Sequence, residues 1–414
     1  MQSRPKILFI SSARPNAFGI GVEQRAWSHL DCLNAVGCVD LVLAVKGSAH
    51  VAPEESTALL SKCRSVTILN LEHTKVKSGR SIPGWALANK LLRFGRPSVA
   101  IPKGYRSEPA PKKIRTTYEL TFCFRISSYQ ILKGILADRS IFTRTLHVDF
   151  DDIESLAQKR QIKFLRRQQG KEKSLVAWIA AMETRLLERT IQREADYVSV
   201  CSTLDQERLL SRSGKAKICV IPNSFRIKCP LPERGENARS RLLFVGTMNY
   251  RPNEDAALYF ATAIFPQIRA ALNKEVEFYI VGRYPHDRVK ALNTPGVITV
   301  TGGVDDVEPY YRDADLVVVP IRFGGGTRIK ILEALAYARP VISTPLGAEG
   351  LDLSNGKEII IADDETSLAR HCVELLQSPE RMRALAIAGR LKVEKRYSYD
   401  AVQSSMRAQI LAML

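Results

Sequence analysis

The sequence lacks the features of a membrane-spanning, disulfide-stabilised or zinc-binding protein. No stretch reaches 18 consecutive apolar residues, so no membrane-spanning helix is expected. The eight cysteines are scattered without a Cys-x-x-Cys pair, which argues against a disulfide framework and against a metal site. The early apolar run, PKILFISS from Pro5, is too short for a secretory signal and continues into fold-like sequence. We therefore expect a cytoplasmic protein with no metal and no cofactor.

Acidic residues are scarce relative to basic ones in one half of the chain only. Residues 241–414 contain 21 Lys and Arg and 21 Asp and Glu, so the whole excess of 18 positive charges belongs to residues 1–240. Such a basic surface attracts an anionic partner: a membrane face, a phosphorylated acceptor or a nucleic acid. No recognisable nucleic-acid-binding motif accompanies the charge, so we expect no nucleic acid. The length of 414 residues suits two domains of roughly 200 residues each.

The most informative stretch combines a strand, a glycine turn and a helix. The run Leu316–Pro320 is apolar and β-branched, as in strands buried on both faces of a parallel sheet. Three glycines then break the strand, and Thr327 is expected to N-cap a helix from Arg328 to about Ala338. Free backbone amides and the helix N-terminus together favour an anion at this turn.

The charges around this turn fit a nucleotide diphosphate. Arg328 and Lys330 place two cations in the first helical turn, where the helix dipole disfavours them unless an anion lies nearby. Glu333 shares a helix face with Lys330 and is placed to bind a ribose diol. The alternative is a simple strand-to-helix turn with a solvated Arg-x-Lys.

The segment GGGTRIKILEA, residues 324–334, resembles the donor site of retaining glycosyltransferases of family 4. It is most similar to the bacterial polysaccharide-type branch, whose pattern is GGGTR-x-K-x-x-E-A. The resemblance implies the GT-B fold, an α/β architecture of two doubly wound Rossmann-like domains facing each other across a cleft. It implies a metal-independent hexosyltransferase that moves a sugar from a nucleotide-diphosphate donor to a glycan or lipid-linked acceptor. Most of the family has a glutamate where this chain has Gly325, so the donor sugar cannot be carried over.

The resemblance also assigns roles to residues. The loop after the strand at 241–245 would bring Gly246 and Arg251 to the donor phosphates, while Asp255 stands near the place of the family's usual lysine. Arg328 and Lys330 would be catalytic, because they stabilise negative charge on the leaving diphosphate. The expected donor-binding set is Gly246, Arg251, Gly324, Gly325, Gly326, Thr327, Arg328, Lys330 and Glu333.

The first half resembles the family only in outline. Residues 6–12 and residues 241–247 each consist of a basic residue, four apolar residues and two small residues. This repeat suggests two similar domains. Gly19, Gly21 and Arg25 follow the first strand and are expected on the acceptor side, although a simple turn explains the glycines equally well. His147 and Asp151 are further catalytic candidates at the strand predicted for residues 141–150; alternatively, the acidic residues there cap the next helix.

The expected domains are residues 1–225 on the acceptor side, a linker at 226–240, a nucleotide-sugar domain at 241–395 and a helix at 396–414 that packs back onto the first domain. Residues 75–115 and the strongly basic segment 158–173 suggest peripheral contact with an anionic inner membrane face. A surface loop and a solvated helix explain these two segments equally well. Two other functions stay open: a nucleotide-sugar epimerase of GT-B-like fold, and a non-catalytic basic binding protein or scaffold.

Overall fold

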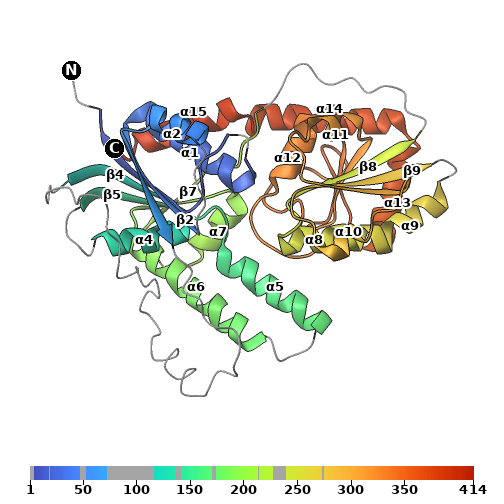
Figure 1. Ribbon diagram of the computed structural model, residues 1–414, viewed down its shortest axis with the longest axis horizontal. Helices are drawn as coiled ribbons and strands as arrows, with labels where there is room; N and C mark the ends of the chain where they lie inside the picture. The colour runs from blue at the N-terminus through green and yellow to red at the C-terminus, as the bar shows by residue number, and fades with distance from the viewer. Residues whose placement is uncertain are drawn as a thin grey trace. The chain divides into compact units, whose positions relative to one another are not determined.

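The computed structural model describes residues 4–17, 19–46, 53–71, 116–136, 141–169, 174–212, 214–226, 239–272 and 275–414. Its tertiary contacts divide the chain into two compact units. Unit 1 comprises Met1–Lys159, Lys171–Ile221 and Gln403–Leu414, and unit 2 comprises Arg160–Gly170 and Pro222–Val402. Each unit is built around its own parallel sheet (Figure 1).

Unit 1 contains a seven-stranded sheet in the order β3-β2-β1-β4-β5-β6-β7, and its neighbouring strands are parallel. Its strands are β1 (Lys6–Ser11), β2 (Cys38–Lys46), β3 (Ser65–Leu71), β4 (Thr116–Phe124), β5 (Ile141–Asp149), β6 (Tyr197–Val200) and β7 (Lys217–Val220). The accompanying helices are α1 (Gly21–Val36), α2 (Pro53–Lys62), α4 (Ile126–Leu136), α5 (Glu154–Gln169), α6 (Ser174–Glu194) and α7 (Thr203–Leu210). The central strand β1 is a continuous apolar run buried on both faces, as a parallel sheet covered by helices requires.

Unit 2 contains a six-stranded parallel sheet in the order β10-β9-β8-β11-β12-β13. Its strands are β8 (Ser240–Val245), β9 (Val276–Val281), β10 (Ile298–Gly302), β11 (Leu316–Val319), β12 (Val341–Ser343) and β13 (Ile360–Ile361). Its helices are α8 (Arg251–Tyr259), the π-helix η1 (Phe260–Ile264), α9 (Phe265–Ala271), α10 (Asp287–Lys290), α11 (Glu308–Asp313), α12 (Ile329–Ala336), α13 (Glu365–Leu376) and α14 (Pro379–Arg396). In Figure 1, α8, α9, α10 and α13 lie along one face of this sheet, and α11, α12 and α14 along the other. The predicted architecture of two doubly wound Rossmann-like sheets is thereby confirmed.

The last helix, α15 (Tyr399–Leu411), begins in unit 2 and ends in unit 1. Within unit 1, the Gln403 side-chain amide donates to the Ser28 carbonyl at 2.8 Å, and Thr145 Oγ1 donates to the Met413 carbonyl at 3.1 Å. The predicted domain boundaries stay predictions. The contact division falls at Ile221 rather than at residue 225, and most of the proposed linker lies outside the described residues.

Of the two segments predicted to contact a membrane, the structure describes only part of the second. Residues 75–115 lie outside the described residues. In the second segment, the Phe164 ring of α5 stacks on Phe323 with ring centres 4.4 Å apart, and both residues belong to unit 2. This apolar side chain therefore packs against protein rather than remaining free for a bilayer. Among the described residues, no helix is long and apolar enough to cross a membrane.

Candidate functional site

Two loops of unit 2 begin where the order of its sheet reverses. β8 and β11 are neighbours, yet β9 and β12, the strands that follow them in the chain, lie on opposite sides of this pair. Ligands of open α/β sheets bind at such a switch point, outside the carboxyl ends of the strands. Gly246 begins the loop after β8, and the glycine turn Gly324–Gly326 lies between β11 and α12. The fold thus brings both halves of the predicted donor-binding set to one edge of the sheet.

The glycine turn requires glycine at two of its three positions. Gly324 has φ +119° and Gly326 has φ +70°, values at which a side chain strains the backbone. A Cβ added to Gly324 would also lie 3.1 Å from Nη2 of Arg328 and 3.3 Å from Cγ of Pro252. Gly325 does not have positive φ. The position that carries a glutamate in most of the resembling family therefore accepts a side chain without backbone strain.

The helix α12 begins one residue later than predicted. Its N-cap is Arg328, whose backbone is extended, so the prediction that Thr327 caps this helix is wrong. The Thr327 hydroxyl instead accepts a hydrogen bond from the Asn223 side-chain amide at 2.8 Å. The Arg328 guanidinium donates to the carbonyls of Gly325 and Gly326, which holds this largely buried cation against the glycine turn.

Lys330 lies in the first turn of α12 and is half-buried. Its Nζ donates to Oδ1 of Asn253 at 2.7 Å and lies 4.2 Å from the centre of the Phe244 ring. A Cβ added to Gly246 would lie only 2.7 Å from this Nζ, so glycine at that position leaves room for the ammonium. Burial, and to a smaller degree the charge of Arg328, lower the pKa of Lys330 from 10.5 to about 7. An added anion would stabilise the charged form.

Glu333 follows Lys330 by three residues and has a buried partner. The hydroxyl of Tyr311, from α11, donates to Oε2 of Glu333 at 2.8 Å. Burial, and then the Glu333 carboxylate, raise the pKa of Tyr311 well above its usual value, so the phenol stays protonated as a donor. A carboxylate has about four lone-pair sites, so Glu333 can accept more hydrogen bonds than the one from Tyr311.

Arg251 and Asp255 lie on α8, beside the glycine turn. Arg251 is the first residue of this helix and is exposed. Asp255 is bound by both Nε and Nη2 of Arg322, at 2.9 and 2.7 Å. The negative charge that replaces the family's usual lysine is therefore balanced within the protein and does not oppose an incoming anion.

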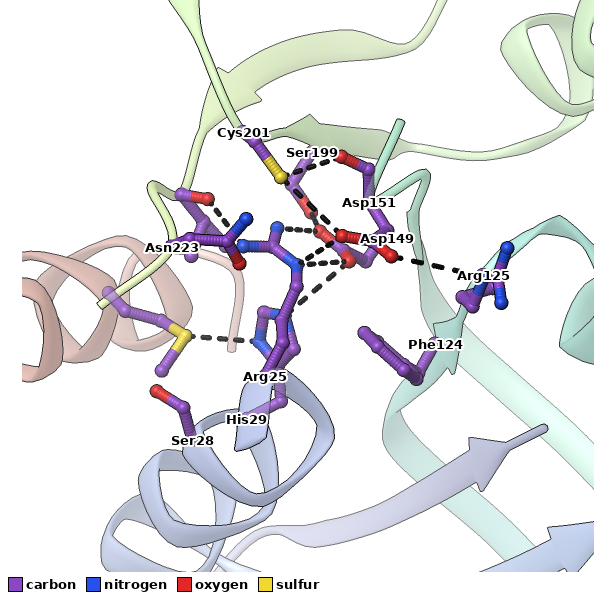
Figure 2. A network of polar contacts seen from close by, with 12 residues as sticks. Arg25, Ser28, His29, Phe124, Arg125, Asp149, Asp151, Ser199, Cys201 and Asn223 are labelled. Carbon is purple, nitrogen blue, oxygen red and sulfur yellow. Dashed lines mark hydrogen bonds and ion pairs between the residues drawn. The ribbon is translucent and has the colours of Figure 1, made fainter. Parts of the chain in front are cut away.

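A second polar cluster lies in unit 1 around Asp149, the last residue of β5 (Figure 2). Arg25, from α1, donates to both carboxylate oxygens of Asp149, at 3.0 and 2.7 Å, and its third nitrogen donates to the Ile221 carbonyl at 2.9 Å. The Ser199 hydroxyl donates to Asp149 Oδ1 at 2.6 Å. Arg25 and Asp149 are 4% and 0% exposed. The predicted acceptor-side Arg25 is thus a buried ion-pair partner.

The ionisation of this cluster follows from its burial and its charges. Burial by itself raises the pKa of Asp149, but Arg25 and His29 outweigh burial and hold that pKa well below its usual range. His29 Nε2 lies 3.5 Å from Asp149 Oδ2, and burial lowers the pKa of His29. The cluster at neutral pH is therefore an ionised Arg25–Asp149 pair beside a neutral imidazole.

The two catalytic candidates of the first half differ in their surroundings. His147 lies inside β5 and is 0% exposed, with Nε2 2.8 Å from the Ser199 hydroxyl, and burial lowers its pKa to about 3. An enclosed neutral imidazole has no surface to offer a substrate, which argues against a catalytic role for His147. Asp151 follows the strand in a left-handed conformation with φ +58°, is partly exposed and lies 3.5 Å from Arg25 Nε. Its catalytic role stays a prediction.

The two predicted acceptor-side glycines border the start of α1. Gly21 is the first residue of this helix rather than part of the preceding loop. Gly19 lies against Glu23, because an added Cβ would be 2.2 Å from Glu23 Oε2, and this same oxygen accepts from the Ile20 amide at 2.9 Å. Glu23 therefore binds a backbone amide at the N-terminus of α1. An acceptor-side role for Gly19 and Gly21 stays a prediction.

Sequence reasoning missed the residues that touch the predicted ones from other elements. Asn253 and Tyr311 bind Lys330 and Glu333 across 77 and 22 positions of sequence. The sequence gives one weak indication of a role for Asn253, because it is a polar residue on the otherwise apolar buried side of α8. Among the residues that the structure describes, no group of three His, Cys, Asp or Glu side chains is placed to hold a metal ion.

The comparisons with known proteins place a family signature on unit 2. Residues 239–378, about a third of the chain, match the family model described as Glycosyl transferases group 1. This range contains the whole expected donor-binding set. An uncharacterised 44.6 kDa protein in the cps region of Klebsiella pneumoniae is 23% identical over 174 residues, which is 40% of this chain and 44% of that protein. The match therefore spans less than half the length of this curated relative.

Solved structures resemble the chain over nearly its whole length. Sucrose-phosphate synthase from Thermosynechococcus elongatus is 16% identical, with a TM-score of 0.66 over 99% of this chain and 100% of that one. HepE from Anabaena, solved in complex with UDP-glucose, is 13% identical, with a TM-score of 0.61 and the same coverage of both chains. At such low identity the likeness concerns the fold, and it confirms the GT-B class.

Proposed function

We propose that this chain is a glycosyltransferase that moves a sugar from a nucleotide-diphosphate donor to an acceptor, with retention of the anomeric configuration. The observation that carries the proposal is the cationic edge of the second sheet. There the glycine turn, the α12 N-terminus, Arg328 and Lys330 meet the Gly246 loop at the switch point. The family signature found by comparison covers the same stretch.

In this proposal the donor diphosphate binds at the glycine turn. Arg328 and Lys330, with the amides that begin α12, stabilise the negative charge that develops on the leaving diphosphate. Such preorganised charge is usually the largest catalytic contribution. Glu333, held by Tyr311, accepts hydrogen bonds from the ribose hydroxyls, and Arg251 adds positive charge from the start of α8. Because these side chains supply the charge, we expect turnover to persist in EDTA.

The acceptor proposed is a glycan or a lipid-linked intermediate that carries negative charge. The excess of 18 positive charges in residues 1–240 would attract such a molecule to the first half of the chain. Since the Anabaena HepE structure contains UDP-glucose, UDP-sugars are the first donors to test.

Ligand-induced thermal stabilisation tests the donor site. At a hundredfold excess over its Kd a ligand stabilises the folded state by about 2.7 kcal/mol. For domains of this size that corresponds to roughly 5–10 °C in Tm. We expect one of UDP-, GDP-, ADP- or dTDP-sugars to give such a shift, and Glu333→Gln to reduce it while keeping an acceptor for Tyr311. Glu380→Ala, an exposed change on α14, serves as the control.

Three outcomes separate the candidate functions. A shift by one nucleotide sugar that Glu333→Gln reduces and Glu380→Ala leaves unchanged supports the proposal. A product formed from the donor alone, without acceptor, would identify an epimerase instead. If none of the four classes of nucleotide sugar raises the Tm, the donor assignment is overturned.

A further inference from the structure

We propose that Asn253 positions the Lys330 ammonium and that a nucleotide diphosphate binds only to the protonated form of Lys330, so that binding takes up a proton near neutral pH. The inference rests on the proposed function, because it assigns the diphosphate to this edge of unit 2. It adds Asn253 as a positioning residue and predicts that donor binding depends on pH.

Lys330 is half-buried, and its ammonium has an unusual set of partners. Its hydrogen-bond partner is the uncharged side-chain oxygen of Asn253, at 2.7 Å, and the ring of Phe244 covers it at 4.2 Å. Buried ammonium groups are normally paired with a carboxylate, because an isolated charge is costly away from water. Here an amide fixes the direction of the ammonium without balancing its charge.

Asn253 is itself held in place. It is 7% exposed, and its side-chain nitrogen donates to the Thr247 carbonyl at 2.9 Å. That bond orients the amide so that its oxygen faces Lys330. The Thr247 carbonyl belongs to the loop after β8, so Asn253 ties this loop, α8 and the start of α12 together through one side chain.

The charged groups that act on Lys330 come from its own segment. Arg328 disfavours the protonated form and Glu333 favours it, while burial is the largest influence and disfavours it. The neighbouring elements contribute the neutral Asn253 amide from α8 and the Phe244 ring from β8. With its pKa lowered to about 7, Lys330 loses its proton in part of the molecules near neutral pH.

A bound diphosphate changes this balance. Two phosphate groups beside the ammonium favour its charged form, so the complex holds a full proton on Lys330. The proton comes from solvent and is taken up in the fraction of molecules that lacked it. The expected uptake is therefore larger at pH 8, above the lowered pKa of Lys330, than at pH 6.

Proton uptake is measured by titration calorimetry with UDP in two phosphate-free buffers of different ionisation enthalpy. We expect the apparent binding enthalpy to depend on the buffer at pH 8 and much less at pH 6. Asn253→Asp keeps the acceptor oxygen and adds a charge, so the midpoint of the pH dependence should rise by about one unit or more. Asn253→Leu has a similar volume but no acceptor, and should weaken UDP binding at every pH.

A second measurement does not need a ligand. Because the pKa of Lys330 is lower in the folded protein than its ordinary 10.5, the unfolded chain binds more protons between pH 7 and 10.5. Folding stability contributed by Lys330 therefore rises with pH across that window and is constant below it. Lys330→Met should remove this rise, whereas Lys290→Met, at an exposed lysine of α10, should retain it.

The outcomes distinguish failure of this inference from failure of the proposed function. Proton uptake on UDP binding whose pH midpoint rises in Asn253→Asp supports the inference. UDP binding without buffer dependence, an unchanged midpoint in Asn253→Asp, or unweakened binding in Asn253→Leu overturns it and leaves the glycosyltransferase proposal standing. If neither UDP nor another nucleoside diphosphate binds, both the inference and the proposed function are overturned. If Lys330→Met leaves the pH dependence of folding stability unchanged, the lowered pKa of Lys330 is refuted, and the inference with it.

Discussion

Replacing Arg25 by Met should destabilise unit 1 by about 3–5 kcal/mol, because the change leaves the Asp149 carboxylate buried without its partner. The geometry supports the upper part of this range. Both carboxylate oxygens receive bonds from the guanidinium, at 3.0 and 2.7 Å, and Asp149 is 0% exposed. The third guanidinium bond, to the Ile221 carbonyl, is lost as well.

Urea unfolding at pH 7, followed by tryptophan fluorescence, is the assay. All three tryptophans, Trp27, Trp85 and Trp178, lie in the first half of the sequence, so the signal reports on unit 1. The double variant Arg25→Met/Asp149→Asn removes both charges and should recover most of the loss. Lys133→Met breaks a half-exposed pair with Glu194 and should cost less than about 1 kcal/mol.

The pH dependence of the same comparison has a defined sign. The pKa of Asp149 is lower in the folded protein than in the unfolded chain, so its stabilisation is present above roughly pH 4 and is lost as the pH falls further. The difference between wild type and Arg25→Met should shrink over that acidic range. A cost for Arg25→Met no larger than that of Lys133→Met, or a double variant no more stable than the single one, would refute the reasoning.

Two further predictions concern the donor side. Gly324→Ala should weaken UDP binding by about tenfold or more, because φ +119° and the 3.1 Å approach to Arg328 require the turn to rearrange, whereas Gly325→Ala should bind nearly as wild type. Equal affinities for the two variants, measured by calorimetry, would show that the turn does not shape the site. Tyr311→Phe removes the hydroxyl that holds Glu333 and should raise the Kd for the nucleotide sugar several-fold, while Tyr310→Phe, at the neighbouring position, should not. An unchanged Kd in both tyrosine variants would separate Glu333 from ribose binding.

The central strands could be predicted from sequence because β1, β8 and β11 are short, mainly apolar runs buried on both faces. The strand predicted at residues 241–245 matches β8, and the run Leu316–Pro320 matches β11 to within one residue. Parallel sheets covered by helices produce this signal without long-range information. The switch point of unit 2 follows from the same pattern, once the order of strands and helices along the chain is known.

The environment of single side chains could not be predicted in this way. His147 reads as a polar residue near the end of a strand, but the C-terminal segment covers it, with Met413 Sδ 3.3 Å from His147 Nδ1. No local sequence pattern predicts a contact between residues that lie 266 positions apart. Thr327 failed as a helix cap for a smaller reason: the turn continues through one more residue, and its hydroxyl bonds to Asn223 instead.

The two polar clusters differ in how their charges are compensated, and this difference separates structural from binding roles more clearly than residue type does. In unit 1 the buried cation Arg25 lies against the buried anion Asp149, so the cluster is complete without a ligand. In unit 2 the Lys330 ammonium is directed by the neutral amide of Asn253, and burial disfavours its charge. A diphosphate would supply the missing negative charge. On this argument Lys330→Met should make the protein more stable near neutral pH and unable to bind the donor, the usual consequence of removing a strained binding group.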